Sequence, residues 1–166
     1  MQIAVVTGNP KAQSRTLEAA TNLATAVAGP PTTVVDVIEL GPGLLTWGDE
    51  PVTAAVEAVR AADVAVFASP TYKATYTGLL KLFLDLFPSD GLRGVVGIPL
   101  MLGAGPGHAL APELLLKPVL VELGATCPTK GLYLLESNYT GTILDPWLDV
   151  ARSQVQAAVA GLRRPG

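Results

Sequence analysis

Short apolar runs rich in β-branched residues alternate along this chain with longer segments whose apolar residues recur at helical spacing. Residues 2–7 read QIAVVT and are followed by Gly8-Asn9-Pro10, a pattern typical of a buried strand that ends in a turn. Ser14 stands where a helix cap belongs, ahead of apolar residues spaced helically from Leu17 to Val27. The chain therefore begins with a strand, a turn and a helix.

The same alternation continues along the rest of the chain. Further strands are predicted at about residues 33–38, 63–68, 92–102 and 130–135. Helices are predicted at about 51–60 and 78–87, from the end of a glycine loop at 103–107 to about 123, and at about 145–162. Pro118 falls inside the helix that ends near residue 123, and a proline there should kink it.

Five strands that alternate with helices specify an α/β fold, in which a parallel sheet carries helices on both faces. Because crossover connections are right-handed, few strand orders remain, and the flavodoxin-like order 2-1-3-4-5 is the leading one. We therefore expect a flavodoxin-like three-layer sandwich forming a single domain over residues 1–166. Ligands of such sheets bind beyond the carboxyl ends of the strands, so the loops after the first, third and fourth strands form the candidate site.

Composition narrows the class of function. Apolar residues make up 49% of the chain and charged residues 15%, which favours a homodimer or homotetramer that hides apolar surface between its copies. A net charge of −3 argues against a nucleic-acid partner. The basic pair Arg163-Arg164 is interpreted as a frayed terminus rather than a binding patch.

The cysteine and histidine counts and the lengths of the apolar runs argue against a disulfide-bonded, metal-binding or membrane-spanning protein. A single cysteine, Cys127, excludes an internal disulfide, and with one histidine a transition-metal centre is not expected. No apolar run approaches the roughly 20 residues that cross a bilayer, and the pattern of a signal peptide is missing. We therefore expect a cytoplasmic protein without a membrane partner.

The first candidate loop, residues 7–16 (TGNPKAQSRT), has the composition of a phosphate site. The start of a helix offers free backbone N–H groups and the positive end of the helix dipole. Ser14 and Thr16 add hydroxyl donors, Arg15 adds a guanidinium fork, and Gly8 leaves the backbone free to turn. The candidate binding residues are Gly8, Asn9, Pro10, Ser14, Arg15 and Thr16. By itself this loop does not separate a phosphate site from a capping serine beside a solvated arginine.

The second candidate loop opens the segment 69–85, SPTYKATYTGLLKLFLD. Ser69-Pro70 stops the third strand, and Tyr72 and Tyr76 flank a stretch that cannot form a regular helix. Backbone groups exposed by such a turn can bond a heterocycle while aromatic side chains cover its edge. The helix that follows is apolar nearly all round, which predicts that a partner subunit covers its outer side.

This segment resembles the NADPH-dependent FMN reductase family, whose pattern here is S/T-P-x-Y, a short polar stretch, G-x-L-K and an aspartate. The resemblance implies that Pro70, Thr71, Tyr72 and Lys73 hold the isoalloxazine ring of FMN. Gly78, Lys81 and Asp85 complete the pattern, and we interpret Asp85 as a helix or interface residue.

The third candidate loop, residues 103–108 (GAGPGH), lies at the same edge of the expected sheet. With the helix after it, it is similar to family members that serve two-component sulfonate monooxygenases, which implies close approach of Gly103, Ala104 and Gly105 to the flavin. His108 is a weak candidate for acid–base chemistry, because hydride transfer to a flavin needs no obligatory protein proton donor. Leu115 departs from the tyrosine that such members can carry, which leaves flavin release and subunit packing open.

As a whole, the resemblance implies an NAD(P)H-dependent FMN reductase, an oxidoreductase in which NADPH or NADH gives a hydride to FMN. The flavin would supply the chemistry and the protein the alignment of two rings, so no catalytic side chain is implied. Reduced FMN would then leave for a partner flavin-dependent monooxygenase.

Three other interpretations stay open on the sequence alone. A tightly bound FMN could pass electrons to quinones, azo dyes or metal oxyanions. The chain could be a flavodoxin-type electron carrier without catalysis, although such carriers usually have a strongly acidic docking face and this chain carries a net charge of only −3. A degenerate fold that binds no flavin is the third.

Overall fold

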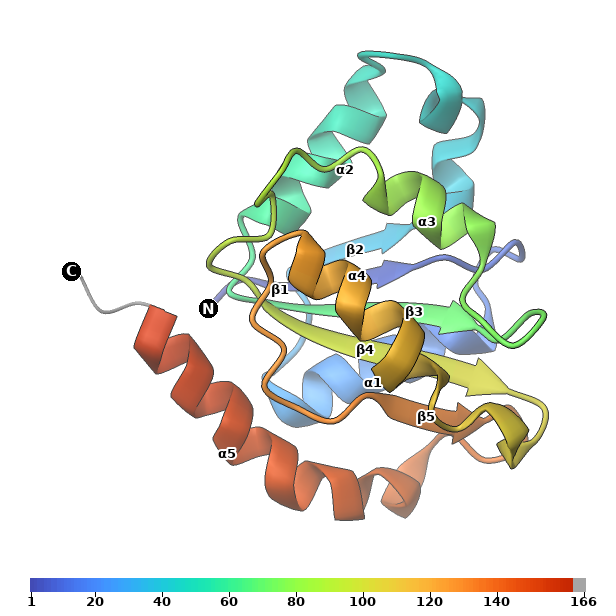
Figure 1. The fold of residues 1–166 in the computed structure, drawn as a ribbon, viewed down its shortest axis with the longest axis vertical. Helices are drawn as coiled ribbons and strands as arrows, with labels where there is room; N and C mark the ends of the chain where they lie inside the picture. The colour runs from blue at the N-terminus through green and yellow to red at the C-terminus, as the bar shows by residue number, and fades with distance from the viewer. Residues whose placement is uncertain (163–166) are drawn as a thin grey trace.

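The computed structural model describes residues 1–162, and Arg163-Arg164 lie outside the described residues. At its centre is a five-stranded parallel sheet in the order β2-β1-β3-β4-β5 (Figure 1). The strands are β1 (Ile3–Thr7), β2 (Thr33–Asp36), β3 (Val64–Pro70), β4 (Val96–Gly103) and β5 (Leu132–Leu135). The flavodoxin-like order expected from the sequence is confirmed.

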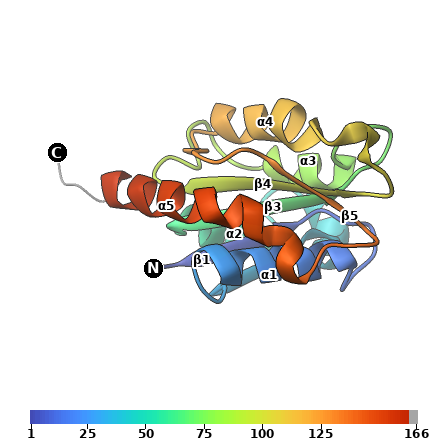
Figure 2. The ribbon, with the colours of Figure 1, turned by 90° about the horizontal axis from the view of Figure 1, so that it is seen from below.

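Helices cover both faces of this sheet, as the view from below shows (Figure 2). On one face lie α1 (Arg15–Val27) and α5 (Asp145–Leu162), and on the other lie α2 (Glu50–Arg60), α3 (Gly78–Leu84) and α4 (Lys117–Glu122). The shorter segments are the 3₁₀ turns η1 (Val37–Leu45), η2 (Pro106–His108) and η4 (Gly141–Leu144) and the π-helical turn η3 (Pro112–Leu116). Within residues 1–162, no helix is long and apolar enough to span a membrane.

The central strand β3 is buried along its whole length. Its side chains alternate between the two cores, with Val64, Val66 and Ala68 toward α1 and α5 and with Ala65 and Phe67 toward the opposite helices. A parallel strand buried on both faces has no polar alternation, which explains its continuous apolar sequence. The loop that follows β3 therefore leaves the sheet at the middle of its carboxyl edge.

Several element ends differ from the sequence expectation. Strand β2 ends at Asp36 rather than near residue 38, and β4 begins at Val96 rather than near residue 92. Two further differences have a local reason. Strand β3 continues two residues past Ala68, because Ser69 and Pro70 still pair with β4. Helix α3 ends at Leu84 rather than Phe87, because the chain tightens there into 3₁₀-type bonds, with the Phe87 N–H donating to the Leu84 carbonyl.

Pro118 interrupts its helix, but the distortion lies before it. The π-helical turn η3 precedes α4, and Pro118 falls in the first turn of α4. In a regular α-helix the ring of Pro118 would clash with the carbonyl of Leu114 and leave it without a donor. In the wider turn, the Lys117 N–H donates to the carbonyl of Pro112, five residues earlier. The helix can therefore contain a proline, which has no N–H to donate.

Candidate functional site

Three loops meet at the carboxyl edge of the sheet: loop 1 (residues 8–14), loop 2 (residues 71–77) and loop 3 (residues 104–108). The Gly8 N–H donates to the carbonyl of Ala68 at 2.9 Å, and the Thr77 hydroxyl donates to the carbonyl of Gly8 at 2.6 Å. The Thr71 N–H donates to the carbonyl of Leu102 at 2.6 Å. Loops 1 and 2 are therefore bonded to each other, and loop 2 is bonded to the end of β4, from which loop 3 emerges.

Loop 1 leads into a well-capped helix. The Ser14 hydroxyl accepts a hydrogen bond from the Leu17 N–H at 3.3 Å, and Ser14 itself is buried. The buried Asn9 side chain braces the turn, donating to the Thr16 hydroxyl at 2.9 Å and accepting from the Lys11 N–H at 2.9 Å. The N–H groups of Arg15 and Thr16, the first two residues of α1, have no acceptor within the helix, so they can bind an anion.

Arg15 reaches away from loop 1 toward the end of β5. Its Nη1 lies 3.3 Å from the Glu136 carbonyl oxygen and 3.9 Å from the Glu136 carboxylate, and its side chain is 63% exposed. An exposed pair at such distances contributes little to stability. The guanidinium can therefore leave Glu136 for a phosphate at the start of α1 at small cost. Glu136 is a neighbour of the site that sequence reasoning did not find.

Gly8 owes its identity to packing rather than to the turn for which it was singled out. Its φ is not positive, and a Cβ at this position would overlap the Cβ of Leu80 and lie 2.7 Å from the Leu80 Cα. Only glycine lets the end of β1 approach the start of α3 so closely. The glycine thus fixes how near loop 1 lies to loop 2.

Loop 2 contains a tight two-residue turn with an unfavourable backbone. The Tyr72 N–H and carbonyl each hydrogen-bond to Thr75, and the residues between them, Lys73 and Ala74, have φ values of 51° and 71°. Such turns favour Asn-Gly, and each non-glycine residue in this conformation costs about 1–2 kcal/mol. Backbone strain of this kind is often found at ligand sites. Tyr72 projects beside it, 50% exposed.

Loop 3 is held by a tyrosine of β5. A Cβ on Gly103 would overlap the hydroxyl of Tyr133, and that hydroxyl donates to the Gly105 carbonyl at 2.7 Å. Gly103 is therefore required to seat Tyr133, while Ala104 is exposed at the open edge. His108 is exposed at the end of η2. Tyr133, the one aromatic residue of β5, was not singled out from the sequence.

An open hollow of about 400 Å³ joins loop 2 to loop 3. Its lining is mainly apolar and comes from Ala74 and from η2, η3 and the residues between them. Leu114 and Leu115 form its wall on the η3 side. A hollow with apolar walls beside exposed backbone is suited to the edge of a flat ring.

Buried polar atoms without a partner gather at the same edge. Among the described residues, Thr7 Oγ1 at the end of β1, Asp36 Oδ1 at the end of β2 and Thr71 Oγ1 after β3 are buried without a hydrogen bond. Burial raises the pKa of Asp36, a bond from the Gln13 N–H opposes this, and Glu39 raises it further. Because most buried polar groups in proteins are paired, such atoms indicate that this edge is built for binding rather than for stability alone.

The comparisons with known proteins identify the family. The family model described as NADPH-dependent FMN reductase matches residues 1–140, which include all three loops. The chain belongs to this family. It is 42% identical to the FMN reductase (NADPH) of Escherichia coli over 82 residues, which are 49% of this chain and 43% of that protein. It is 36% identical to the NADH-dependent FMN reductase SfnF of Pseudomonas putida over 78 residues, 47% of this chain and 42% of that protein.

Among solved structures, the apo form of the NADH:FMN oxidoreductase EMOB is 31% identical, with a TM-score of 0.76 over 98% of this chain and 88% of that one. A flavodoxin from the Archaea has 15% identity and a TM-score of 0.60, over 95% of this chain and 99% of that one, and supports the fold alone. The aligned segments span less than half of each curated relative.

Proposed function

We propose that this chain is an NAD(P)H-dependent FMN reductase, in which a single domain over residues 1–166 binds FMN at the carboxyl edge of its sheet. The observation that carries the proposal is the convergence of loops 1, 2 and 3 at that edge in a member of the FMN reductase family. The unpartnered hydroxyls of Thr7 and Thr71 at that edge and the apolar hollow between loops 2 and 3 support a ligand with a polar edge and a flat ring.

The residues divide into two groups by the part of FMN that they would hold. The start of α1, with Ser14, Arg15 and Thr16, binds the phosphate, and Gly8, Asn9 and Pro10 shape the turn before it. The ring would be held by Pro70, Thr71, Tyr72 and Lys73 of the segment after β3 and by the backbone of Gly103, Ala104 and Gly105 after β4.

Bound FMN would supply the chemistry, accepting a hydride from NADPH or NADH. The protein's contribution would be alignment of the two rings, with the turn at Lys73-Ala74 and the Gly103–Gly105 segment braced by Tyr133 as the fixed backbone against which they are held. His108 lines the hollow between loops 2 and 3 and stays a weak candidate for acid–base chemistry, because hydride transfer to a flavin needs no obligatory protein proton donor. We place the reaction in the cytoplasm, where reduced nicotinamide cofactors are regenerated.

The reduced flavin is proposed to serve a partner flavin-dependent monooxygenase. The relatives named FMN reductase and SfnF support this, since those names describe reduction of FMN itself. The open edge around loops 2 and 3 supports it as well, because a flavin seated there could leave without rearrangement of the core.

A homodimer or homotetramer is proposed on the basis of apolar side chains on the α3–α4 side of the sheet. Leu86 after α3, Leu110 and Leu114 before α4, and Val121 within α4 are exposed there. Exposed apolar patches of this kind mark interfaces between chains. Sedimentation equilibrium of the purified protein tests the assembly, and a monomer at micromolar concentration would refute it.

The decisive experiment is an anaerobic absorbance titration of the purified protein with FMN, followed by NADPH or NADH. We expect binding of FMN and bleaching of its absorbance on adding the nicotinamide, with the reduced flavin released through a dialysis membrane. No bleaching at millimolar nicotinamide would refute the reductase. FMN that stays bound in both redox states while a quinone is reduced would instead favour a tightly bound cofactor.

A further inference from the structure

The turn before α1 is tied to a neighbouring strand by one carboxylate. Gln13 lies in loop 1, directly before the cap residue Ser14, and its φ is 50°, a left-handed conformation that glycine adopts more easily than glutamine. The Gln13 N–H donates to Oδ2 of Asp36 at 3.0 Å. Asp36 is the last residue of β2, in register with Thr7 at the end of β1.

The position of Asp36 at the end of β2 is unfavourable for a carboxylate. Asp36 is only 6% exposed, and its Oδ1 has no partner among the described residues. The hydroxyl of Thr7, its neighbour across the strands, is buried without a partner as well. A side chain selected for packing alone would be apolar here, because an unpaired buried polar atom lowers stability. The carboxylate of Asp36 therefore has a task other than packing, and its bond to the Gln13 N–H indicates that the task is to hold Gln13.

That task follows from the position of Gln13 in the chain. The conformation of the residue before a cap sets the direction in which the first turn of the helix presents its N–H groups. A hydrogen bond to an ionised carboxylate is shorter and stronger than one to a neutral acceptor, so Asp36 can hold a strained conformation that a neutral side chain would hold less firmly.

We propose that Asp36 is a positioning residue of the phosphate seat, which holds Gln13 left-handed so that the first N–H groups of α1 converge on the phosphate of FMN. The inference rests on the proposed function, since it assigns the phosphate to α1. Asp36 is buried and bonds the backbone of loop 1, so we place it behind the seat and not in contact with the ligand.

The test compares FMN with riboflavin, which has the same ring and no phosphate. Dissociation constants of both ligands are measured for the wild type, Asp36→Ala and Asp36→Asn, with Glu39→Gln as a matched control that removes a nearby charge and leaves the Gln13 bond intact. Asp36→Ala should weaken FMN binding about tenfold and change riboflavin binding less than about twofold. Asp36→Asn keeps an acceptor and should recover most of the loss, and Glu39→Gln should resemble the wild type.

A second pair of variants keeps the test decisive if Asp36→Ala does not fold. Asp36→Leu preserves the buried volume without an acceptor and should show the same selective loss of FMN. In a Gln13→Gly background, where the left-handed conformation carries no strain, either Asp36 substitution should reduce FMN affinity less than it does beside Gln13. Equal effects in the two backgrounds would contradict the assigned role.

The outcomes separate this inference from the function on which it rests. A wild type that binds FMN no better than riboflavin refutes the phosphate seat itself. A wild type that prefers FMN, with Asp36→Leu showing the same preference, overturns the role of Asp36 alone. Equal losses of both ligands would make Asp36 a general structural residue and overturn the proposal too.

Discussion

Gly8 and Leu80 pack backbone to backbone: a methyl group on Gly8 would overlap the Leu80 Cβ and lie 2.8 Å from the Leu80 nitrogen. These residues come from the end of β1 and the first turn of α3, which are far apart in the sequence. The contact brings loop 1, where we place the phosphate, against loop 2, where we place the ring. The distance between the two halves of the proposed FMN site is thus set by the absence of one side chain.

Gly8→Ala should destabilise the protein by about 1–3 kcal/mol, because the methyl group meets backbone atoms that cannot rotate away. Urea denaturation of the variant measures the loss. Gly78→Ala is the matched control: nothing lies within 4 Å of a Cβ there, and alanine in a helix should be neutral or stabilising. A Gly8→Ala variant as stable as Gly78→Ala would contradict the packing argument.

Thr77→Val should remove two interactions at once. The Thr77 hydroxyl caps α3 by accepting from the Leu80 N–H at 3.1 Å, and it donates to the Gly8 carbonyl at 2.6 Å. Loss of the cap and of a buried donor should lower the free energy of unfolding by about 2–4 kcal/mol. Thr77→Ser keeps the hydroxyl and should stay within about 1 kcal/mol of wild type, by the same denaturation measurement.

Arg15→Ala should weaken FMN binding by about 1.5–3 kcal/mol, the usual contribution of a hydrogen bond to a charged group. Riboflavin binding should barely change, because that ligand has no phosphate. The variant should remain as stable as wild type, since the contacts of Arg15 with Glu136 are long and exposed. Isothermal titration with both flavins distinguishes the outcomes, and equal losses of the two ligands would refute the assignment.

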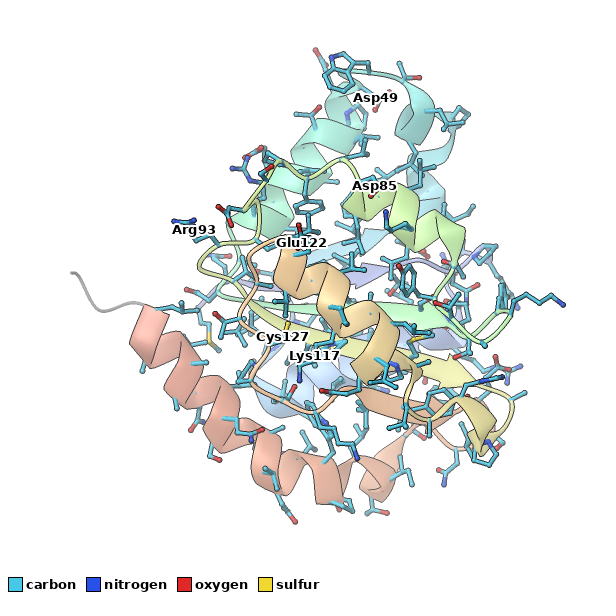
Figure 3. The ribbon with its side chains drawn as sticks, viewed as in Figure 1. Asp49, Asp85, Arg93, Lys117, Glu122 and Cys127 are labelled. Carbon is cyan, nitrogen blue, oxygen red and sulfur yellow. The ribbon has the colours of Figure 1, made fainter. Side chains whose placement is uncertain are left out.

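The thiol of Cys127 should react slowly in the folded protein. Burial raises its pKa from 9.0 to about 11, an effect that Lys117 opposes and Glu113 reinforces. Figure 3 labels Cys127 and Lys117, the first residue of α4. At pH 8 the native thiolate should be about 100-fold scarcer than in the unfolded chain. Iodoacetamide labelling of native and urea-unfolded protein measures the ratio, and similar rates would contradict the burial of the thiol.

The raised pKa of Cys127 also determines the direction in which stability changes with pH. The native state favours the protonated thiol, so its contribution is present below the unfolded value of 9.0 and is lost as the pH rises toward 11. Cys127→Ala should therefore lose less stability than the wild type as the pH rises. Melting temperatures of both proteins between pH 8 and pH 11 measure the difference.

Glu113→Gln should weaken the attachment of η3 to the chain before β5. Burial raises the pKa of Glu113, but bonds from the Lys117 ammonium at 2.8 Å and from the Gly131 N–H at 2.6 Å outweigh it and lower the pKa below 4.5. A depressed carboxyl pKa stabilises the fold above that value and loses the effect as the pH falls through the folded pKa. We expect Glu113→Gln to lower the free energy of unfolding by about 1.5–3 kcal/mol at pH 7, and by less near pH 4. Urea denaturation of the variant and the wild type at both pH values measures the difference.

Local patterns were sufficient to predict several elements of this protein. The sequence of Ser14 and its helix predicts a cap that the structure confirms, and the periodicity from Asp145 to Leu162 predicts α5 with both ends correct. These succeed because caps and helical faces depend on residues within a few positions of one another. The ends of β3 and α3 were predicted less well, because pairing with β4 and packing of the following turn decide them.

What the sequence by itself determined is the order of strands and helices, and with it the edge of the sheet where loops 1, 2 and 3 must emerge. Only the tertiary structure decided which residues support those loops. Leu80 beside Gly8, Asp36 beneath Gln13 and Tyr133 against Gly103 come from distant parts of the chain. No local pattern marks such pairs, because each partner's role depends on the contact that folding creates between them.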